Sequence, residues 1–378
     1  MANGNLIIKE RGERGPRLLF IEPYLNGSHR ALAEALMSRL PGRWTLLALP
    51  GRFFRWRMRG AAAFLAEAAG EALRRPWDGL ICSSMLNLAE LKGLVPELAG
   101  TPALVYFHEN QLAYPAGGAA DERQERQDLF LAFSNLTSVA AAKLALFNSA
   151  YHRREVIQAA GALLAKLPDA VPHGLAQALS AKSRALAVPL SVEEANGLRR
   201  EPRQGPLRIL WNHRWSQDKD PRSFFAALFA LAEQGLDFQV AVLGRQSGRP
   251  PAVFQEAASK LGPRLIRQGA LEDRREYWRW LFWADMCVST ALQEYQGLAV
   301  AEAAWAGCRP LVPDALVYPE LYPAGLRYGP GKLEQALAGL IAAPDKCRRT
   351  DYQALARPMT WQALAPAWRR ALEELCAP

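Results

Sequence analysis

The sequence lacks any run approaching the roughly twenty uncharged apolar residues that a membrane-spanning helix needs. Its first seventeen residues contain no continuous apolar core of the kind found in secretory signal peptides. Cysteine is scarce, and the five cysteines show no paired metal-ligand spacing. We therefore expect a cytoplasmic protein with no membrane contact, whose cysteines are free thiols.

Three widespread motifs are also missing. The chain has no G-x-x-x-x-G-K-[ST] phosphate loop, no G-x-G-x-x-G fingerprint and no G-x-S-x-G nucleophile elbow. These absences argue against assigning the chain to the common classes of nucleotidase, dehydrogenase and hydrolase.

The composition is that of a folded protein with an excess of positive charge. Apolar residues make up 50% of the 378 residues, which excludes a disordered chain and suits two domains, each with its own core. Lysine and arginine outnumber aspartate and glutamate by 46 to 37, a formal charge of +9. This excess favours a polyanionic partner without requiring one, because arginine-rich composition is also common in GC-rich genomes.

Strand and helix patterns alternate along almost the whole chain, which predicts an α/β protein with two parallel sheets of about five strands each. Strands are expected at residues 17–23, 44–50, 78–84, 103–109 and 143–149, and then at 207–212, 238–244, 264–269, 286–290 and 308–314. Polar, proline and glycine residues gather at 191–206, as in a linker. We expect a Rossmann-like domain (1–190), the linker (191–206), a second Rossmann-like domain (207–350) and a helical segment (351–378) that packs back on the domains.

Polar residues cluster just after the predicted strands, at the sheet edge where ligands bind in parallel α/β folds. After the first strand, the turn at Gly27 could present backbone amides to an anion, with His29 beside it. An ordinary capped helix begins in the same way, so this pattern leaves both interpretations open.

A second cluster follows the fourth strand, where four hydrogen-bonding side chains stand in a row. These are His108, Glu109, Asn110 and Gln111. Such a row suits a ligand with many hydroxyl groups, and we favour a functional role over a solvated turn. His173 is expected to end the last strand of this half, with a structural role at least as well supported as a functional one.

In the second half, Glu294 and Glu302 flank the start of a helix between two apolar strands, so both carboxylates could reach one ligand. Arg214 and Lys219 follow the strand at 207–212, and two such cations can neutralise a diphosphate.

Glycines mark two further strand or helix ends, Gly244 and Gly297, where backbone amides could receive phosphate oxygens. Asp218 and Asp220 match a short D-x-D metal pattern, but Asp220 precedes Pro221 and is interpreted as a helix cap. The arginine pairs at 199–200 and 274–275 are expected to be solvated.

The spacing of Arg214, Lys219, Glu294 and Glu302 resembles that of retaining GT-B glycosyltransferases, which use nucleotide-diphosphate sugars. Within that group, the strings IEPYLNGSH (21–29), FHENQLAYP (107–115), NHRWSQDKDP (212–221) and DALVYPELYP (314–323) resemble those of the tRNA-queuosine α-mannosyltransferases. The resemblance covers nearly the whole chain. It implies two Rossmann-like domains whose parallel sheets face each other across a cleft.

The resemblance also implies roles for individual residues. Glu302 would bind the ribose hydroxyls and Glu294 the hydroxyls of the donor sugar. Arg214 and Lys219 would stabilise the departing diphosphate. Amides around Gly297 and Leu298, and near Gly244, would assist them. The Gly27 turn would approach the phosphates or the acceptor.

In this family the donor is GDP-mannose and the acceptor is the cyclopentenediol of queuosine at the wobble position of tRNA for aspartate. His108 would lie over the sugar, and His108 and Glu109 are the candidates for a catalytic base. His29, Asn110 and Gln111 would face the acceptor. No cofactor or metal is expected, because two side-chain cations replace the metal.

A tRNA acceptor also needs a surface that binds RNA. The stretch at 51–60 places arginines among aromatic residues, and arginine with exposed aromatics can hold phosphates and stack on unpaired bases. We select Arg52, Arg55, Trp56 and Arg57 as candidate RNA contacts. The alternative is an amphipathic loop whose aromatics pack onto their own domain.

Two other functions remain open on the sequence alone. One is a related GT-B glycosyltransferase with another sugar donor or a non-RNA acceptor, since guanine recognition cannot be derived from the expected base-reading stretches, 244–247 and 269–273. The other is a two-domain small-ligand or RNA-binding protein without catalysis, which would have no need for paired cations opposite two glutamates.

Overall fold

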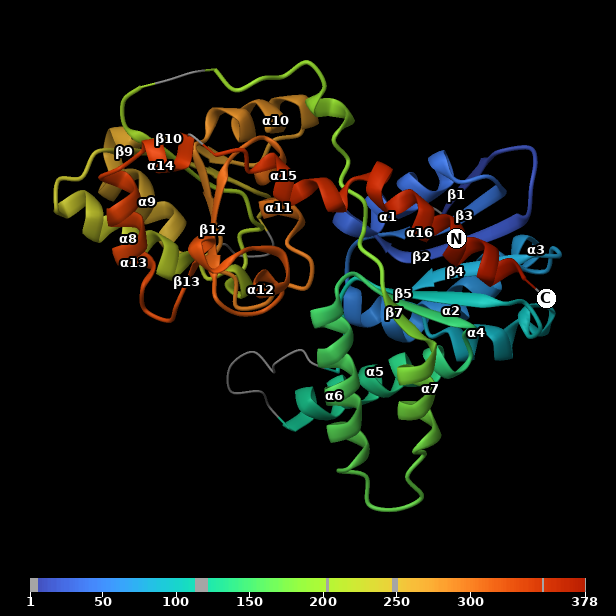
Figure 1. Ribbon diagram of the computed structural model, residues 1–378. Helices are drawn as coiled ribbons and strands as arrows, with labels where there is room; N and C mark the ends of the chain where they lie inside the picture. The colour runs from blue at the N-terminus through green and yellow to red at the C-terminus, as the bar shows by residue number, and fades with distance from the viewer. Residues whose placement is uncertain (1–5, 113–121, 202–203, 247–250, 349, 378) are drawn as a thin grey trace. The chain divides into compact units, whose positions relative to one another are not determined.

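The chain folds into two compact α/β units, each built around one sheet. The computed structural model describes residues 6–112, 122–201, 204–246, 251–348 and 350–377 (Figure 1). Unit 1 comprises Met1–Pro189 and Leu364–Pro378, and unit 2 comprises Leu190–Ala363.

Unit 1 contains a seven-stranded sheet in the order β1-β3-β2-β4-β5-β6-β7, in which every neighbouring pair is parallel except β1 with β3. The strands are β1 (Ile7–Arg11), β2 (Arg17–Leu25), β3 (Arg43–Pro50), β4 (Gly79–Ser83), β5 (Ala103–Phe107), β6 (Leu144–Phe147) and β7 (Ser183–Ala185). The helices are α1 (Gly27–Arg39), α2 (Phe54–Ala68), α3 (Gly70–Leu73), α4 (Leu88–Leu94), α5 (Glu122–Ala140), α6 (Ala150–Leu164), α7 (Gly174–Lys182) and most of α16 (Trp361–Cys376).

Both faces of this sheet are covered, which is why its central strands read as continuous apolar runs. β4, β5 and β6 are buried at every residue. One face packs on α2 and α4–α7 through a single apolar cluster. On the other face, Tyr106 lies against Trp368 of α16, with ring centroids 5.6 Å apart.

Unit 2 contains a six-stranded, fully parallel sheet in the order β10-β9-β8-β11-β12-β13. The strands are β8 (Leu207–Trp211), β9 (Phe238–Leu243), β10 (Leu265–Gly269), β11 (Met286–Val288), β12 (Arg309–Pro313) and β13 (Arg327–Tyr328). The helices are α8 (Pro221–Glu233), α9 (Val253–Leu261), α10 (Arg274–Trp283), α11 (Leu298–Trp305), α12 (Tyr318–Leu321), α13 (Leu333–Ile341), α14 (Asp345–Arg348) and α15 (Gln353–Ala356).

The ten expected strands correspond to β2–β6 and β8–β12, and the α/β class with two largely parallel sheets is confirmed. The strand count of about five per sheet was too low, because β1, β7 and β13 also join the sheets. The expectation that His173 ends a strand is wrong, since this exposed residue directly precedes α7.

Local sequence signals set the turns that carry the site. Asn26 caps α1 by accepting the Gly27 N–H at 2.8 Å, and Asp220 caps α8 by accepting the Ser223 N–H at 3.2 Å, as its position before Pro221 predicts. Gly297, with φ of +72°, ends the turn before α11. This left-handed conformation favours glycine.

Candidate active site

In unit 2, the turn between β11 and α11 is built around the Glu294 carboxylate. Its Oε1 accepts the backbone N–H groups of Tyr295 (3.1 Å), Gln296 (3.2 Å) and Gly297 (2.9 Å). Burial opposes ionisation of Glu294, but Lys219 and these N–H groups lower its pKa to about 2. Glu294 is therefore a fixed anion. The Gly297 N–H, which we expected to bind a phosphate oxygen, donates to the Glu294 carboxylate instead.

Lys219 is the cation that holds this carboxylate. Its Nζ donates to Glu294 Oε2 at 3.1 Å and to the backbone oxygen of Gln293 at 2.7 Å. The Asp218 carboxylate lies 3.4 Å from Nζ and 3.6 Å from a guanidinium nitrogen of Arg214, so it links the two predicted cations. Lys219 is buried, whereas Arg214 is mostly exposed and can move toward a ligand.

Glu302 lies on α11, where two residues of α10 orient its carboxylate. Oε1 accepts from Arg274 at 2.8 Å, and Oε2 accepts from the Tyr277 hydroxyl at 2.7 Å. Burial, followed by the Glu302 charge, raises the pKa of Tyr277 well above its usual range, so the hydroxyl stays protonated and donates. Asn212 in turn donates to that hydroxyl at 2.9 Å.

Sequence reasoning missed Tyr277 and the pairing of Arg274, which is exposed as expected but also contacts Glu302. Arg274 binds Glu302 and places its guanidinium carbon 4.8 Å from the centroid of the Tyr277 ring. Their i, i+3 spacing puts both on one helix face, a signal present in the sequence but ambiguous without a partner. Arg200, which we also expected to be solvated, donates to the Ala284 carbonyl and is only partly exposed.

Gly244 is needed for a close backbone approach. Its φ is +143°, and a Cβ added there would lie 1.9 Å from the His213 carbonyl oxygen. Its N–H points to the Gly269 carbonyl at 3.3 Å. Gly244 therefore lies against the loop after β8 and the end of β10, and its N–H, which we expected to receive a phosphate oxygen, is directed at the Gly269 carbonyl.

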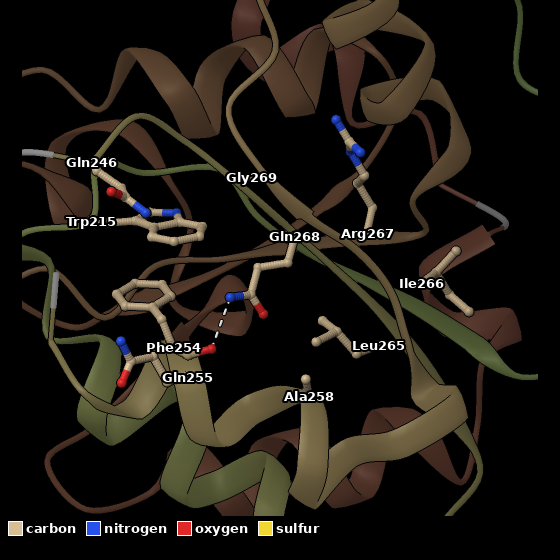
Figure 2. Close-up of a pocket in the computed structure, with 10 residues that line it drawn as sticks. All are labelled: Trp215, Gln246, Phe254, Gln255, Ala258, Leu265, Ile266, Arg267, Gln268 and Gly269. Carbon is tan, nitrogen blue, oxygen red and sulfur yellow. Dashed lines mark hydrogen bonds between the residues drawn. The ribbon is translucent and has the colours of Figure 1, made fainter.

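Beside these loops lies a cavity of about 490 Å³ between α9 and β10 (Figure 2). Its lining residues are Trp215, Gln246, Phe254, Gln255, Ala258 and Leu265–Gly269. Gln246 and Gly269 belong to the two expected base-reading stretches, whereas Ser247 lies outside the described residues. Trp215 stacks on Phe254 with ring centroids 4.1 Å apart, and its indole N–H is buried with no hydrogen-bond partner in the described part of the chain.

In unit 1, His29 lies between two carboxylates. It is the third residue of α1 and only 3% exposed, with Nδ1 2.9 Å from Glu22 Oε2 and Nε2 3.3 Å from Glu109 Oε1. Burial opposes protonation, but Glu22 and Glu109 together raise the pKa of His29 to about 10. At neutral pH His29 is therefore an imidazolium, and Glu22 is a site neighbour that the sequence did not reveal.

His108 directly follows β5 and stacks on His29, with ring centroids 3.9 Å apart and planes 24° from parallel. Burial, together with the charges of His29 and His152, holds the pKa of His108 well below its usual range. Neither ring nitrogen has a hydrogen-bond partner within the described residues. His108 is thus a neutral, buried ring whose two nitrogens are unpaired among the described residues.

The rest of the polar row at 108–111 is partly structural. Asn110 is buried and donates from Nδ2 to His152 Nε2 at 2.8 Å, and Asn148 completes this network by accepting from His152 Nδ1 at 2.8 Å. The Gln111 N–H faces Asn135 Oδ1 at 3.5 Å. The Glu109 side chain is one-third exposed and lies against His29.

The arginine and aromatic residues at 51–60 form the start of α2. Phe53 and Trp56 are 71% and 64% exposed, so the alternative interpretation, in which these aromatics pack onto their own domain, does not hold for these two residues. Arg52 and Arg55 place their guanidinium groups over Phe53 and Phe54, at 6.0 and 5.4 Å from the ring centroids. Nearby, Arg59 lies over Phe130 of α5 at 5.1 Å, and Phe130 is also exposed.

Within the described part of the chain, no helix combines the length and apolar character needed to cross a membrane.

Comparison with known protein structures identifies the fold class of this chain. Sucrose-phosphate synthase from Thermosynechococcus elongatus superposes with a TM-score of 0.65 at 13% identity, over 95% of this chain and 99% of its own. A UDP-forming alpha,alpha-trehalose-phosphate synthase from Burkholderia xenovorans gives 0.64 at 13% identity, over 96% and 99%. At such low identity they show the fold alone, and that fold is the expected one of the GT-B glycosyltransferases.

Sequence comparison gives the family. Residues 17–190 match the family described as tRNA-queuosine alpha-mannosyltransferase N-terminal. The tRNA-queuosine alpha-mannosyltransferase of Drosophila melanogaster is 35% identical over 318 residues, which cover 82% of each chain. The chain belongs to the tRNA-queuosine alpha-mannosyltransferase family, as its motifs predict, and it is therefore a glycosyltransferase that uses a nucleotide-sugar donor.

Proposed function

We propose that the protein transfers mannose from GDP-mannose to the cyclopentenediol of queuosine in tRNA, with retention of the anomeric configuration. The observation that carries this proposal is the donor-type constellation of unit 2 in a member of this family. Lys219 is fixed on Glu294, and Glu302 is oriented by Arg274 and Tyr277. Each of these side chains could bind one part of a nucleotide sugar.

The capacity of each donor residue follows from its contacts. The Lys219 ammonium donates to Gln293 and Glu294 and has Asp218 3.4 Å away, so it would serve a diphosphate oxygen by exchanging the longer Asp218 contact for the phosphate. Glu294 Oε2 accepts from Lys219 and has lone-pair capacity for a sugar hydroxyl. Exposed Arg214 would add the second cation. The amides of Leu298 and of the Gly27 turn remain proposed phosphate contacts.

The mechanism requires stabilisation of a leaving diphosphate while the sugar becomes oxocarbenium-like. Lys219 and Arg214 would supply that stabilisation without a metal ion. Retention without a covalent nucleophile implies attack on the face from which the diphosphate leaves, so the leaving phosphate accepts the proton of the acceptor. His108, neutral and unpartnered, would hydrogen-bond the sugar. Undiminished turnover in EDTA would support this metal-free scheme.

The base of the donor would enter the cavity beside Gln246 and Gly269. A purine needs hydrogen-bonding groups at its edge, and Gln246, Gln268 and the Trp215 N–H are polar groups there. Gln268 Nε2 already donates to the Phe254 carbonyl at 2.8 Å, which leaves its oxygen as an acceptor.

The RNA would bind the exposed surface formed by Arg52, Phe53, Arg55, Trp56 and Arg57. Guanidinium groups neutralise phosphates, and exposed aromatic faces stack on unpaired bases of an anticodon loop. The positive net charge of the protein supports such a partner.

The test is mass spectrometry of nucleosides from queuosine-containing tRNA after incubation with the protein and GDP-mannose, with UDP-glucose and UDP-galactose in parallel. A hexose added to queuosine only with GDP-mannose is the expected result. Addition from a different donor would correct the sugar assignment. No addition from any donor, with hydrolysis of a sugar nucleotide, would discard the tRNA acceptor.

A further inference from the structure

Three ionisable side chains of unit 1 form a row that runs from the interior toward the surface. Glu22 at its inner end is 0% exposed, His29 is 3% exposed, and the outer Glu109 side chain is 33% exposed. Glu22 comes from β2, His29 from α1, and Glu109 from the turn after β5. A carboxylate–imidazolium–carboxylate row therefore connects three separate elements.

The inner end of the row is rigidly held. Glu22 Oε1 accepts from the Ser83 hydroxyl at 2.8 Å and from the Tyr24 N–H at 2.9 Å, while Oε2 faces His29 Nδ1. A fully buried charge is costly to retain unless it is paired and hydrogen-bonded, and replacement by apolar residues is often neutral or stabilising. The inner pair is thus poorly explained by stability alone.

The outer end of the row is held almost symmetrically. His29 Nε2 lies 3.3 Å from Glu109 Oε1 and 3.4 Å from Oε2, so the imidazolium N–H faces both oxygens. The Ser84 hydroxyl fixes the same residue by donating to its backbone oxygen at 3.0 Å. Each carboxylate oxygen can accept more than one donor, and the Glu109 side chain is one-third exposed, so a ligand can reach it.

We propose that Glu22 and His29 are positioning residues that fix the Glu109 carboxylate so that its two oxygens bind the two hydroxyls of a vicinal diol on the acceptor. This inference rests on the proposed function and names its acceptor subsite. Two adjacent hydroxyls are paired donors, and an oriented carboxylate is the matching pair of acceptors. Burial, followed by the His29 charge, lowers the pKa of the stacked His108, so His108 would meet the substrate as an uncharged ring.

The positioning half of the inference is tested by NMR of protein labelled with ¹⁵N-histidine. The chain has five histidines, so single substitutions assign each ring. In the wild-type protein the His29 ring carries both protons throughout pH 7–9, and Glu22→Gln shifts its titration to lower pH. Glu34→Gln, on the exposed side of α1, is the matched control and leaves His29 unchanged. A neutral wild-type His29 at pH 8 overturns the inference without any variant.

The acceptor half is tested by kinetics. Glu109→Gln and Glu22→Gln each raise the KM for queuosine-containing tRNA about tenfold or more, the loss expected for one charge-assisted hydrogen bond. In both variants the loss of tRNA affinity exceeds any change in the hydrolysis of GDP-mannose without acceptor, and the control Glu34→Gln changes neither. Glu22→Asp, which keeps the charge, recovers part of the lost affinity. Equal loss of donor hydrolysis and acceptor affinity overturns the assignment.

Failure of the proposed function is distinguishable from failure of this inference. Absence of transfer by the wild-type protein refutes the former, whereas the His29 signals judge the row independently. Ligand atoms of Glu22, His29 and His108 also lie within 4.8 Å of one another, a grouping compatible with a metal ion. One equivalent of zinc in the purified protein, lost in Glu22→Gln, overturns the inference in favour of a metal centre.

Discussion

Replacing Glu302 by Gln tests the donor site most directly, because the change keeps the shape of the side chain and removes its charge. The two Glu302 oxygens are oriented by Arg274 at 2.8 Å and Tyr277 at 2.7 Å, and each has capacity for a ribose hydroxyl. A hydrogen bond to a charged group contributes about 1.5–3 kcal/mol. Because the glutamine oxygen can still accept one hydroxyl, we expect the loss of about one such bond, a 10- to 150-fold weaker affinity for GDP.

Calorimetric titration with GDP and with 2′,3′-dideoxy-GDP separates ribose contact from general damage. In the wild-type protein, removal of both hydroxyls weakens binding by at least this factor. In Glu302→Gln the preference for GDP over the dideoxy nucleotide is smaller than in the wild type, because one of the two contacts is already lost, and the losses are therefore not additive. Glu233→Gln, an exposed glutamate on α8, is the matched control.

Two results would refute this reasoning. Unchanged GDP affinity in Glu302→Gln removes the ribose role altogether. Full additivity, in which the variant still prefers GDP over the dideoxy nucleotide by the wild-type factor, assigns the hydroxyls to another residue. Thermal unfolding of each variant identifies any loss caused by instability.

Three further predictions concern other parts of the molecule. Lys219→Ala lowers turnover at least about 100-fold, because a preorganised charge at the leaving group is lost. The control is Lys260→Ala, at an exposed position of α9, which changes steady-state turnover less than twofold. Phe53→Ala with Trp56→Ala weakens tRNA binding about 10-fold or more in filter-binding assays and leaves GDP affinity unchanged; equal binding refutes the stacking surface. Because the pKa of His29 is raised to about 10, its contribution to stability is complete below about pH 6.5 and is lost as pH rises through about 10. In urea unfolding, the stability of the wild-type protein therefore declines across this range by up to about 1.4 kcal/mol per pH unit. The variant His29→Gln does not show this decline.

The sequence predicts the central strands well because buried parallel strands are continuous apolar runs bounded by polar turns. It does not predict β1, β7 and β13 for a physical reason. β1 (IIKER) is an antiparallel strand at the sheet edge, mostly exposed and without a long apolar run, while β7 and β13 have three and two residues. Such strands form because a neighbouring strand offers hydrogen-bonding groups, which local sequence does not encode.

The same limit applies to the site. Residues directly after strands, such as Lys219, Glu109 and Glu294, are visible as polar letters behind apolar runs. Their partners come from elsewhere in the chain. Glu22 lies within β2, where the sequence shows only a single charged residue in an apolar strand, and Tyr277 is one of several aromatic residues on α10. Which distant residue completes a pair depends on strand order, so only the folded structure shows it.

The close approach at Gly244 has a consequence for changing the donor. Any side chain there would collide with the His213 carbonyl, so the position cannot vary without moving the loop that carries Arg214. Gln246, two residues further on, lines the cavity (Figure 2). On the proposed donor assignment, we expect libraries directed at Gln246 and Gln268, with Gly244 left intact, to change the preferred nucleobase without altering the residues proposed to stabilise the departing diphosphate.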